Sequence, residues 1–184
     1  MLSLTNNNME AMNLLIAKGA NINLRKDSCC SILHEAINKD KLKLAETLLK
    51  KGADLKIKWN DFGQTPLYYA VQNNKYKMVK LILKYDKNVD KKAKFGWTSL
   101  LQCAWHGNKE IAELLIDNGA DINIRHWKNT TPLMIAINKK QFDVAKLLIA
   151  KGADITLKNK KGQAALDLAK KRKNKDIIKL LEEK

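Results

Sequence analysis

Apolar residues recur at helical spacing in short segments along the whole chain. One group is Ile111, Leu114 and Leu115, and the apolar residues at 144, 147 and 148 repeat it thirty-three positions later. Residues three and four positions apart lie on one face of an α-helix. Lysine or aspartate interrupts each apolar segment within about a dozen residues, well below the roughly 20 that a membrane span requires. The pattern predicts short amphipathic helices and no transmembrane segment.

Two short motifs recur between these helical segments. GAN stands at 19–21 and GAD at 52–54, 119–121 and 152–154, and YDKNVD at 85–90 fills the long gap with Asp86 in the glycine position. The second motif is SILHEA, TPLYYA, TSLLQC, TPLMIA or AALDLA, whose third residue is leucine at positions 33, 67, 100, 133 and 166. A fixed period of this length indicates a row of repeated units in which each unit buries its apolar face against its neighbours.

This pattern resembles the ankyrin repeat, a 33-residue unit in which T-P-L-H-x-A opens the first helix and G-A-D-x-N follows the second. The resemblance covers nearly the whole chain. It implies an all-α ankyrin-repeat solenoid made of helix-turn-helix units with hairpin-like fingers. We expect one domain, 1–184, divided into a partial repeat at 1–25, units at 26–58, 59–92, 93–125 and 126–157, and a C-terminal cap repeat at 158–184.

The motif residues have clear physical roles. Thr65 and Thr131 can cap the first helix of their units, because a threonine hydroxyl accepts a free backbone N–H. Pro66 and Pro132 follow at the first helical position, where a missing N–H costs nothing. Glycines at 52, 119 and 152 end the second helix, where a left-handed residue is favoured. Serine, alanine or isoleucine replaces the proline at 99, 165 and 32, which weakens the start signal without abolishing it.

Several units depart from the pattern. We expect Asp86 to take the left-handed conformation of the glycine it replaces, in a distorted turn. The 34-residue gap before Leu67 predicts a longer or bulged finger in KIKWNDFGQ. Cys29 stands where other fingers have glycine, so we expect a different turn at that finger tip. The last unit carries Lys171, Arg172 and a further lysine where internal units face a neighbour, as a polar cap would. The first unit lacks its finger, which suggests a fragment or a short N-terminal cap.

The positive charge of the chain makes a polyanion such as nucleic acid a candidate partner. The formal net charge is +16, and 35 residues are lysine or arginine. Only Arg25, Arg125 and Arg172 are arginine, whereas phosphate and base recognition rely on the rigid fork of the guanidinium. The lysines are spread along the chain instead of clustered. Nucleic-acid binding is therefore an alternative to protein binding and not the first choice.

Little in the sequence supports catalysis or a cofactor. The three cysteines show no C-x-x-C spacing, and Cys103 falls at a buried alanine position of the repeat. We expect His34 of SILHEA to tie the turn to its helix, and a metal bridging His106 and His126 would need ligands that the sequence does not offer. No nucleophile elbow, zincin motif or phosphate loop occurs. We expect a protein that is not an enzyme and needs no cofactor or metal.

The four tryptophans point to binding. In this kind of solenoid, the finger residues and the residues just after the first helix's alanine pair are presented to a partner. All four tryptophans fall at such positions, including Trp59 at the base of the longer finger, for which packing between fingers is an equal alternative. Tryptophan is strongly enriched at binding hot spots. The candidate partner-binding residues are Phe62, Phe95, Trp97, Trp105, His106, His126, Trp127, Asn138 and Lys139.

We therefore expect a non-enzymatic protein-protein interaction module that binds through its concave groove and finger tips, with lysines favouring an acidic partner. Alanine at Trp97 or Trp105 should weaken binding and leave the melting temperature nearly unchanged. The alternatives are a polyanion binder and a structural spacer within a larger chain. No secretion signal opens the chain, although one removed upstream would leave no trace, so we expect a cytoplasmic monomer.

Overall fold

The computed structural model describes residues 14–26 and 30–184. Residues 14–17 are helical, and five helix pairs follow them along the described chain. The first helices of the pairs are α3 (Ile32–Asn38), α5 (Pro66–Gln72), α7 (Ser99–His106), α9 (Pro132–Asn138) and α11 (Ala165–Arg172). The second helices are α4 (Leu42–Lys50), α6 (Tyr76–Leu83), α8 (Lys109–Asp117), α10 (Phe142–Ala150) and α12 (Lys175–Glu182).

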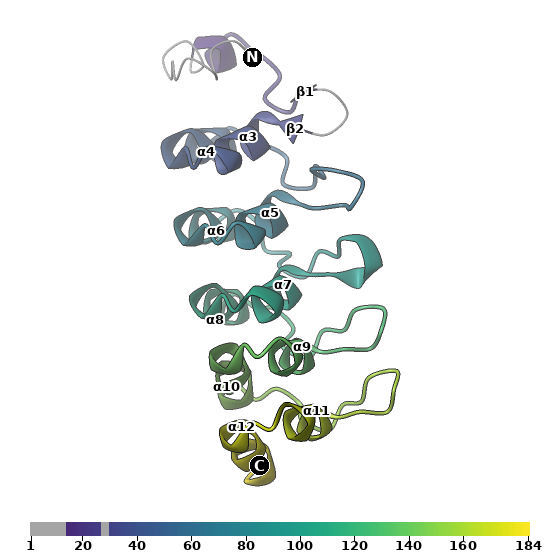
Figure 1. The fold of residues 1–184 in the computed structure, drawn as a ribbon. Coiled ribbons are helices and arrows are strands. Elements are labelled where there is room, and N and C mark those ends of the chain that lie inside the picture. The colour runs from purple at the N-terminus through teal and green to yellow at the C-terminus, as the bar shows by residue number, and fades with distance from the viewer. Residues whose placement is uncertain (1–13, 27–29) are drawn as a thin grey trace.

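The helix pairs stack in a single row, with the fingers projecting to one side (Figure 1). First helices pack on first helices of neighbouring pairs, as α7 does on α5 and α9, and second helices pack on second helices. The chain therefore folds as an all-α solenoid, as the 33-residue period predicts. Among the described helices, none is long and apolar enough to cross a membrane.

The predicted caps begin the first helices. The hydroxyl groups of Thr65 and Thr131 accept the backbone N–H of the residue three positions on, and each is followed by proline in the first turn. Ser31 and Thr98 cap α3 and α7 in the same way without proline. In α11, where alanine is at the cap, the Asp167 carboxylate accepts the Ala164 N–H at 2.8 Å. The weaker start signals still place the helices where the sequence predicted them.

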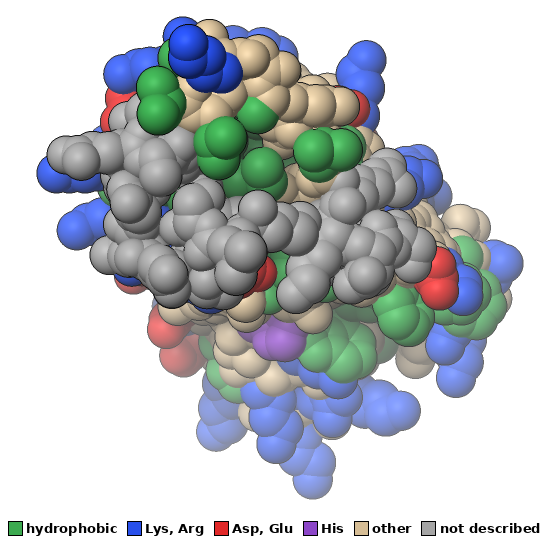
Figure 2. All heavy atoms as spheres, turned by 90° about the horizontal axis from the view of Figure 1, so that it is seen from above, with side chains coloured by type: hydrophobic (Ala, Val, Ile, Leu, Met, Phe, Trp, Pro, Cys, Tyr) green, Lys and Arg blue, Asp and Glu red, His purple; other side chains and the backbone are tan. Residues whose placement is uncertain are grey.

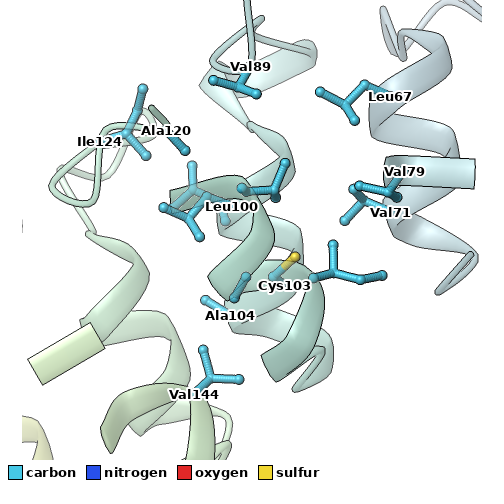
Figure 3. Packing of buried hydrophobic residues seen from close by; sticks show 14 of the residues in the cluster. Leu67, Val71, Val79, Val89, Leu100, Cys103, Ala104, Ala120, Ile124 and Val144 are labelled. Atoms are coloured by element: carbon cyan, nitrogen blue, oxygen red, sulfur yellow. The ribbon is translucent and has the colours of Figure 1, made fainter. Parts of the chain in front are cut away.

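The core runs along the whole stack between the layers of helices. Figure 3 shows Leu67 and Val71 of one unit and Leu100, Cys103 and Ala104 of the next gathered at such a junction. All five side chains are at most 1% exposed. The small residues at the alanine positions let neighbouring helices approach closely. Burial also raises the pKa of the Cys103 thiol, so this cysteine is protonated and part of the packing.

The turns after the second helices confirm one prediction and correct another. Gly52, Gly119 and Gly152 have positive φ angles of 84°, 90° and 86°, as a left-handed turn requires. Asp86 does not share this conformation. Its N–H instead continues the helical pattern by donating to the Ile82 carbonyl at 2.9 Å, and its buried carboxylate accepts Lys91 Nζ at 2.8 Å. Without glycine, this turn carries a partly buried ion pair between Asp86 and Lys91.

The fingers are hairpin-like and joined to one another. In the finger at 25–31, β1 (Arg25–Lys26) pairs antiparallel with β2 (Cys30–Ser31); Cys29, where we expected a different turn, lies outside the described residues. The Trp59 N–H bonds to the Gln64 carbonyl five positions on, whereas the bond from Asn159 to Gln163 spans four. This one-residue difference confirms the bulge expected in KIKWNDFGQ.

The two ends of the stack differ in what can be described. At the C-terminal end, the side chains of Lys171, Arg172 and Lys173 are exposed, as expected of a polar cap. Residues 1–13 of the partial first repeat, including Met1, lie outside the described residues. Seen from the N-terminal end, lysine and arginine side chains line much of the edge of the molecule (Figure 2).

Candidate functional site

The structure brings most of the candidate binding residues together between the fingers at 93–97 and 126–130 and the helices α7 and α9. A groove of about 340 Å³ opens there, which we call the aromatic groove. Its lining consists of Trp97, Trp105, His126, Trp127, Lys128, Thr130, Ile135, Asn138 and Lys139. Six of these nine are among the nine residues proposed from the sequence.

Trp97 forms the base of the aromatic groove. Its ring stacks on the His126 ring, with a centroid distance of 5.4 Å and an interplanar angle of 13°. Trp97 is half-buried against the core, and His126 is only 9% exposed. Both residues therefore support the groove as well as line it. The prediction that alanine at Trp97 leaves the melting temperature nearly unchanged is revised, because the ring packs on its neighbour.

His126 is held neutral in this position. Burial lowers its pKa, and the nearby positive charge of Lys128 lowers that pKa further. The ring Nδ1 accepts the Lys128 backbone N–H at 3.1 Å, which fixes the orientation of the imidazole. A neutral, oriented imidazole gives the Trp97 indole a flat surface on which to stack. His126 thus acts mainly as a support for Trp97 and not as an exposed contact.

Trp105 is the exposed wall of the aromatic groove. It meets Trp97 edge-on, at 5.5 Å and 78°, and remains 40% exposed. The Lys139 ammonium lies over its ring, 3.1 Å from the centroid. The amide of Gln141 from the following unit donates to the Trp105 carbonyl at 3.4 Å. Trp97 and Lys139 therefore contact this indole from two units, and Gln141 anchors its main chain, while its outer side faces solvent.

Trp127 and Phe95 lie at the finger tips beside the aromatic groove. Their rings are tilted at 46° with centroids 6.1 Å apart, and the side chains are 53% and 57% exposed. Phe95 has a φ angle of +60°, in the left-handed region that bulky residues rarely adopt. A strained backbone that presents an exposed aromatic ring is a feature often found at functional sites.

Two candidates lie apart from the aromatic groove. Phe62 is 56% exposed on the neighbouring finger, where its ring faces the Lys94 ammonium at 5.4 Å. His106 is exposed at the end of α7 and does not line the groove. The tips of the fingers are therefore a second surface, which meets the groove at Trp127 and Lys128.

Trp59 packs between neighbouring units, which is the alternative to binding that the sequence left open for it. Its ring stacks on Tyr69 at 4.3 Å and 13°, and it lies 5.0 Å from the buried ring of His34. The Tyr69 hydroxyl donates to the Asn38 side chain at 2.8 Å. His34 joins the turn to the helix, as predicted, through a 2.8 Å bond between its Nδ1 and the Ser31 hydroxyl. This tryptophan holds two units together.

The candidate residues proposed from the sequence did not include four residues at or beside the groove, namely Lys128, Thr130, Ile135 and Lys160. Ile135 of α9 lines the aromatic groove although it lies inside a helix, and it is only 4% exposed. Lys128 and Lys160 both place their ammonium groups over Trp127, at 4.7 and 5.8 Å from the ring centroid. A lysine that follows an exposed aromatic by one residue, or by about one repeat, was the available signal.

The chemistry of the aromatic groove follows from the side chains that line it. Among the described residues, no group of three or more histidine, cysteine, aspartate or glutamate side chains is placed to hold a metal ion. Within the aromatic groove the polar side chains are one amide, one hydroxyl, one histidine and two lysines, together with the indole N–H groups, and no carboxylate lines it. Such a lining suits an apolar side chain of a ligand that has negatively charged groups beside it.

Comparison with known proteins places the chain in a family. Models described as "Ankyrin repeat", "Ankyrin repeats (3 copies)" and "Ankyrin repeats (many copies)" match residues 29–60, 56–126 and 115–169. The chain belongs to the ankyrin repeat family. Ankyrin repeats are in general modules for protein-protein interaction, and the fold is typically a scaffold without enzymatic activity.

Its relatives are ankyrin repeat proteins of several kinds. The chain is 32% identical over 108 residues to the B-cell lymphoma 3 protein homolog of Mus musculus, covering 59% of this chain and 24% of that protein. It is 35% identical over 120 residues to ankyrin repeat protein FPV014 of fowlpox virus (strain NVSL), covering 65% and 27%. The chain thus spans about a quarter of the length of these relatives.

A solved structure agrees with the fold. The crystal structure of an ankyrin repeat domain from Acinetobacter baumannii AYE superposes with a TM-score of 0.90, covering 98% of this chain and 94% of that one. The two sequences are 24% identical. The similarity therefore supports the all-α ankyrin solenoid and carries no information about the partner.

Proposed function

We propose that this ankyrin repeat protein binds a partner protein through the aromatic groove and the neighbouring finger tips, without chemistry. The observation that carries the proposal is the pair of exposed indoles, Trp105 and Trp127, on the two sides of a groove whose base, Trp97, is firmly packed. Soluble proteins rarely expose large apolar side chains together without a binding role. Indoles are also among the side chains that contribute most to binding hot spots.

The binding mechanism is docking onto a preformed surface. The rings of Trp97 and Trp105 are held by contacts with each other, with His126 and with Lys139, so few side chains need to be ordered when a partner arrives. A surface that is already ordered loses less conformational entropy on binding. An apolar side chain of the partner would enter the aromatic groove, and the lysines around it favour a partner with negative charge.

Alanine at Trp105 tests the proposal. The Trp105→Ala variant should retain the helical circular dichroism spectrum and weaken partner binding by about 1 to 2 kcal/mol, which is roughly 5- to 30-fold. Tyr76→Ala is the matched control, because Tyr76 on α6 is 42% exposed against 40% for Trp105 and does not line the groove.

The measurement is quantitative affinity capture from the native cell with mass spectrometry, followed by calorimetric titration of the main captured protein. Proteins retained by the wild type and by Tyr76→Ala, but lost with Trp105→Ala, would support the proposal. Equal capture by the wild type and Trp105→Ala would contradict it. A captured set made only of nucleic acid, sensitive to salt and unaffected by Trp105→Ala, would favour the polyanion alternative.

We also propose that the protein is a cytoplasmic monomer. The free thiol of Cys103 lies buried in the core, which suits a reducing compartment such as the cytoplasm. We infer a monomer that binds its partner through the aromatic groove, and size-exclusion chromatography with light scattering tests this directly. A dimer whose formation is abolished by Trp105→Ala would instead identify a second copy as the occupant of the groove.

A further inference from the structure

The finger tips carry a continuous row of aromatic rings and lysines. Four neighbouring fingers contribute to this row, which we call the finger-tip strip. It is defined by Phe62, Lys94, Phe95, Trp127, Lys128 and Lys160. The Lys94 ammonium lies between the rings of two fingers, 5.4 Å from the Phe62 centroid and 5.5 Å from that of Phe95. Lys128 and Lys160 meet over the single ring of Trp127.

Backbone hydrogen bonds hold the same residues in a ladder. The Lys94 N–H donates to the Phe62 carbonyl at 2.7 Å, and the Trp127 N–H donates to the Phe95 carbonyl at 3.1 Å. The Lys160 N–H completes the ladder by donating to the Lys128 carbonyl at 3.1 Å. Each residue of the finger-tip strip is therefore anchored to the next finger through its own main chain. The rings and ammonium groups keep a fixed order along the axis of the stack.

The lysines of the strip have no negative partner. Among the described residues, no carboxylate forms an ion pair with Lys94, Lys128 or Lys160, whereas Lys91 and Lys151 do form such pairs. The sequence explains this contrast, because 91–109, 122–142 and 155–166 contain no aspartate or glutamate. Asp61, beside Phe62, is the acidic residue of the finger at 56–64, and Asp86 and Asp90 precede the stretch that begins at residue 91. The potential above the strip is therefore positive.

We propose that the finger-tip strip binds an extended acidic segment of the partner, laid along the stack axis, and that its rings fix the lysines that receive the carboxylates. This inference rests on the proposed function and adds where the acidic segment lies and how its charge is read. A lysine resting on an aromatic face has already lost much of its side-chain freedom, since the ring attracts the ammonium. Less ordering is then needed when a carboxylate binds it.

Single-stranded nucleic acid is the competing occupant, because it also uses basic grooves with aromatic side chains. Base stacking needs free ring faces, and here lysine ammonium groups lie over Phe62, Phe95 and Trp127. Trp97 is engaged with His126. Phosphate is also recognised best by arginine, and the strip contains none. The observations therefore favour carboxylates along a polypeptide.

The test uses synthetic probes and fluorescence anisotropy. The first probe is a labelled peptide of Glu-Gly-Glu-Phe repeats, the second has glutamine in place of glutamate, and the third is an oligothymidylate of the same net charge as the first. We expect the acidic peptide to bind the wild type at least about 10-fold more tightly than the glutamine peptide at low salt. It should also bind more tightly than the oligothymidylate.

The decisive variant removes a ring without removing charge. Trp127→Leu should weaken binding of the acidic peptide and reduce the salt dependence of its affinity. Both effects should be nearly as large as in the double variant Lys128→Gln, Lys160→Gln. The matched control is Lys77→Gln with Lys80→Gln, which removes the same charge from α6, away from the fingers. This control should change the affinity less than about twofold, because exposed charges away from the strip are screened. Circular dichroism and thermal melting confirm that each variant is folded.

Several outcomes would overturn the inference. These are equal binding of the acidic and glutamine peptides, oligothymidylate binding at least as tightly as the acidic peptide, no binding of any probe, or an unchanged salt dependence in Trp127→Leu. Failure of the proposed function is separate, since it is judged by loss of the native partner with Trp105→Ala. If Trp105→Ala loses the native partner while the acidic and glutamine peptides bind the wild type equally, the role of the aromatic groove is supported and the role of the finger-tip strip is contradicted.

Discussion

Two neighbouring units place different residues at the same two positions across the groove. In the unit of α5 and α6, Gln64 donates from its side-chain amide to the Gln72 side chain at 3.0 Å. Thirty-three residues later, Trp97 and Trp105 occupy these positions and meet edge-on at 5.5 Å. The flanking helices begin and pack alike in both units. The fold thus accepts a polar or an aromatic pair here, which agrees with the binding role that we propose for the two tryptophans.

Exchanging the aromatic pair for the polar pair is the strongest way to test this contrast. The Trp97→Gln, Trp105→Gln double variant copies the pair of the preceding unit. We expect it to weaken binding of the native partner by about 100-fold or more, near 3 kcal/mol, because both indole contacts are lost. The melting temperature should fall by no more than about 4 °C. Calorimetric titration and thermal circular dichroism measure the two effects.

The reciprocal exchange is the control. Gln64→Trp with Gln72→Trp should leave partner binding intact, because the aromatic groove itself is unchanged. A double glutamine variant that unfolds, while the fold of this reciprocal variant is unaffected, would show that the tryptophans serve stability and would contradict the comparison.

The ring cluster of Trp59, Tyr69 and His34, which packs between two units, should respond in the opposite way. Trp59 stacks on Tyr69 and lies beside buried His34, so Trp59→Ala removes packing between two units. We expect a loss of about 2 kcal/mol in the free energy of unfolding, or a melting temperature lower by roughly 4 to 8 °C. Affinity for the partner, measured well below the melting temperature, should stay within about twofold of the wild type. A tenfold loss of affinity would instead place Trp59 in the binding surface.

Phe95 offers a smaller test, in which stability and binding should change in opposite directions. Its φ of +60° costs a bulky residue about 1 kcal/mol, and Asn129 takes the same region, with φ 54°, in the next finger. Phe95→Asn should therefore raise the free energy of unfolding by roughly 0.5 to 1 kcal/mol and weaken partner binding about 3- to 10-fold. Phe62→Asn is the control: Phe62 is not left-handed, so that variant should gain no stability.

The smallest expected effect concerns the turn that follows the unit of α5 and α6. Asp90 stands where Asn123 stands in the next unit, and both side chains accept a backbone N–H, at 2.9 and 2.8 Å. Burial raises the pKa of Asp90, despite the lowering effect of the Asp121 N–H, and its Oδ1 has no hydrogen-bond partner among the described residues. An amide can accept the same N–H without the cost of a partly buried charge.

The pH dependence of stability follows from the direction of this shift. The folded state holds a proton on Asp90 more tightly than the unfolded chain, whose carboxyl has a pKa near 3.8. The Asp90 contribution to the free energy of unfolding therefore falls as pH rises from the pKa of the unfolded carboxyl through the higher pKa of the folded one, and it stays low at higher pH. Asp90→Asn should be more stable at pH 7 by less than about 1 kcal/mol, with the gain shrinking toward pH 4. Thermal melts at both pH values, with Asn123→Asp as the reciprocal variant, measure this.

Much of the architecture could be read from single residues because local chemistry decides it. Thr65 and Thr131 cap helices through their own hydroxyl groups, and Gly119 turns the chain through its own free φ. The left-handed conformation predicted for Asp86 was wrong, whereas the distorted turn predicted there was right: Asp86 pairs with Lys91, five positions on, in a turn of different shape. The left-handed residues that join the helices of each unit, such as Asn74 and Lys140, also carried no recognised signal.

The sequence by itself determined the period, the helix starts, the glycine turns and the positions that lie outside the core, since each depends on residues close along the chain. Only the tertiary structure decided that Trp59 packs inward while Trp105 stays open, that His126 lies under Trp97, and that two lysines meet over Trp127. These contacts join neighbouring units. Their geometry depends on how one unit is placed on the next, which a repeating pattern does not specify.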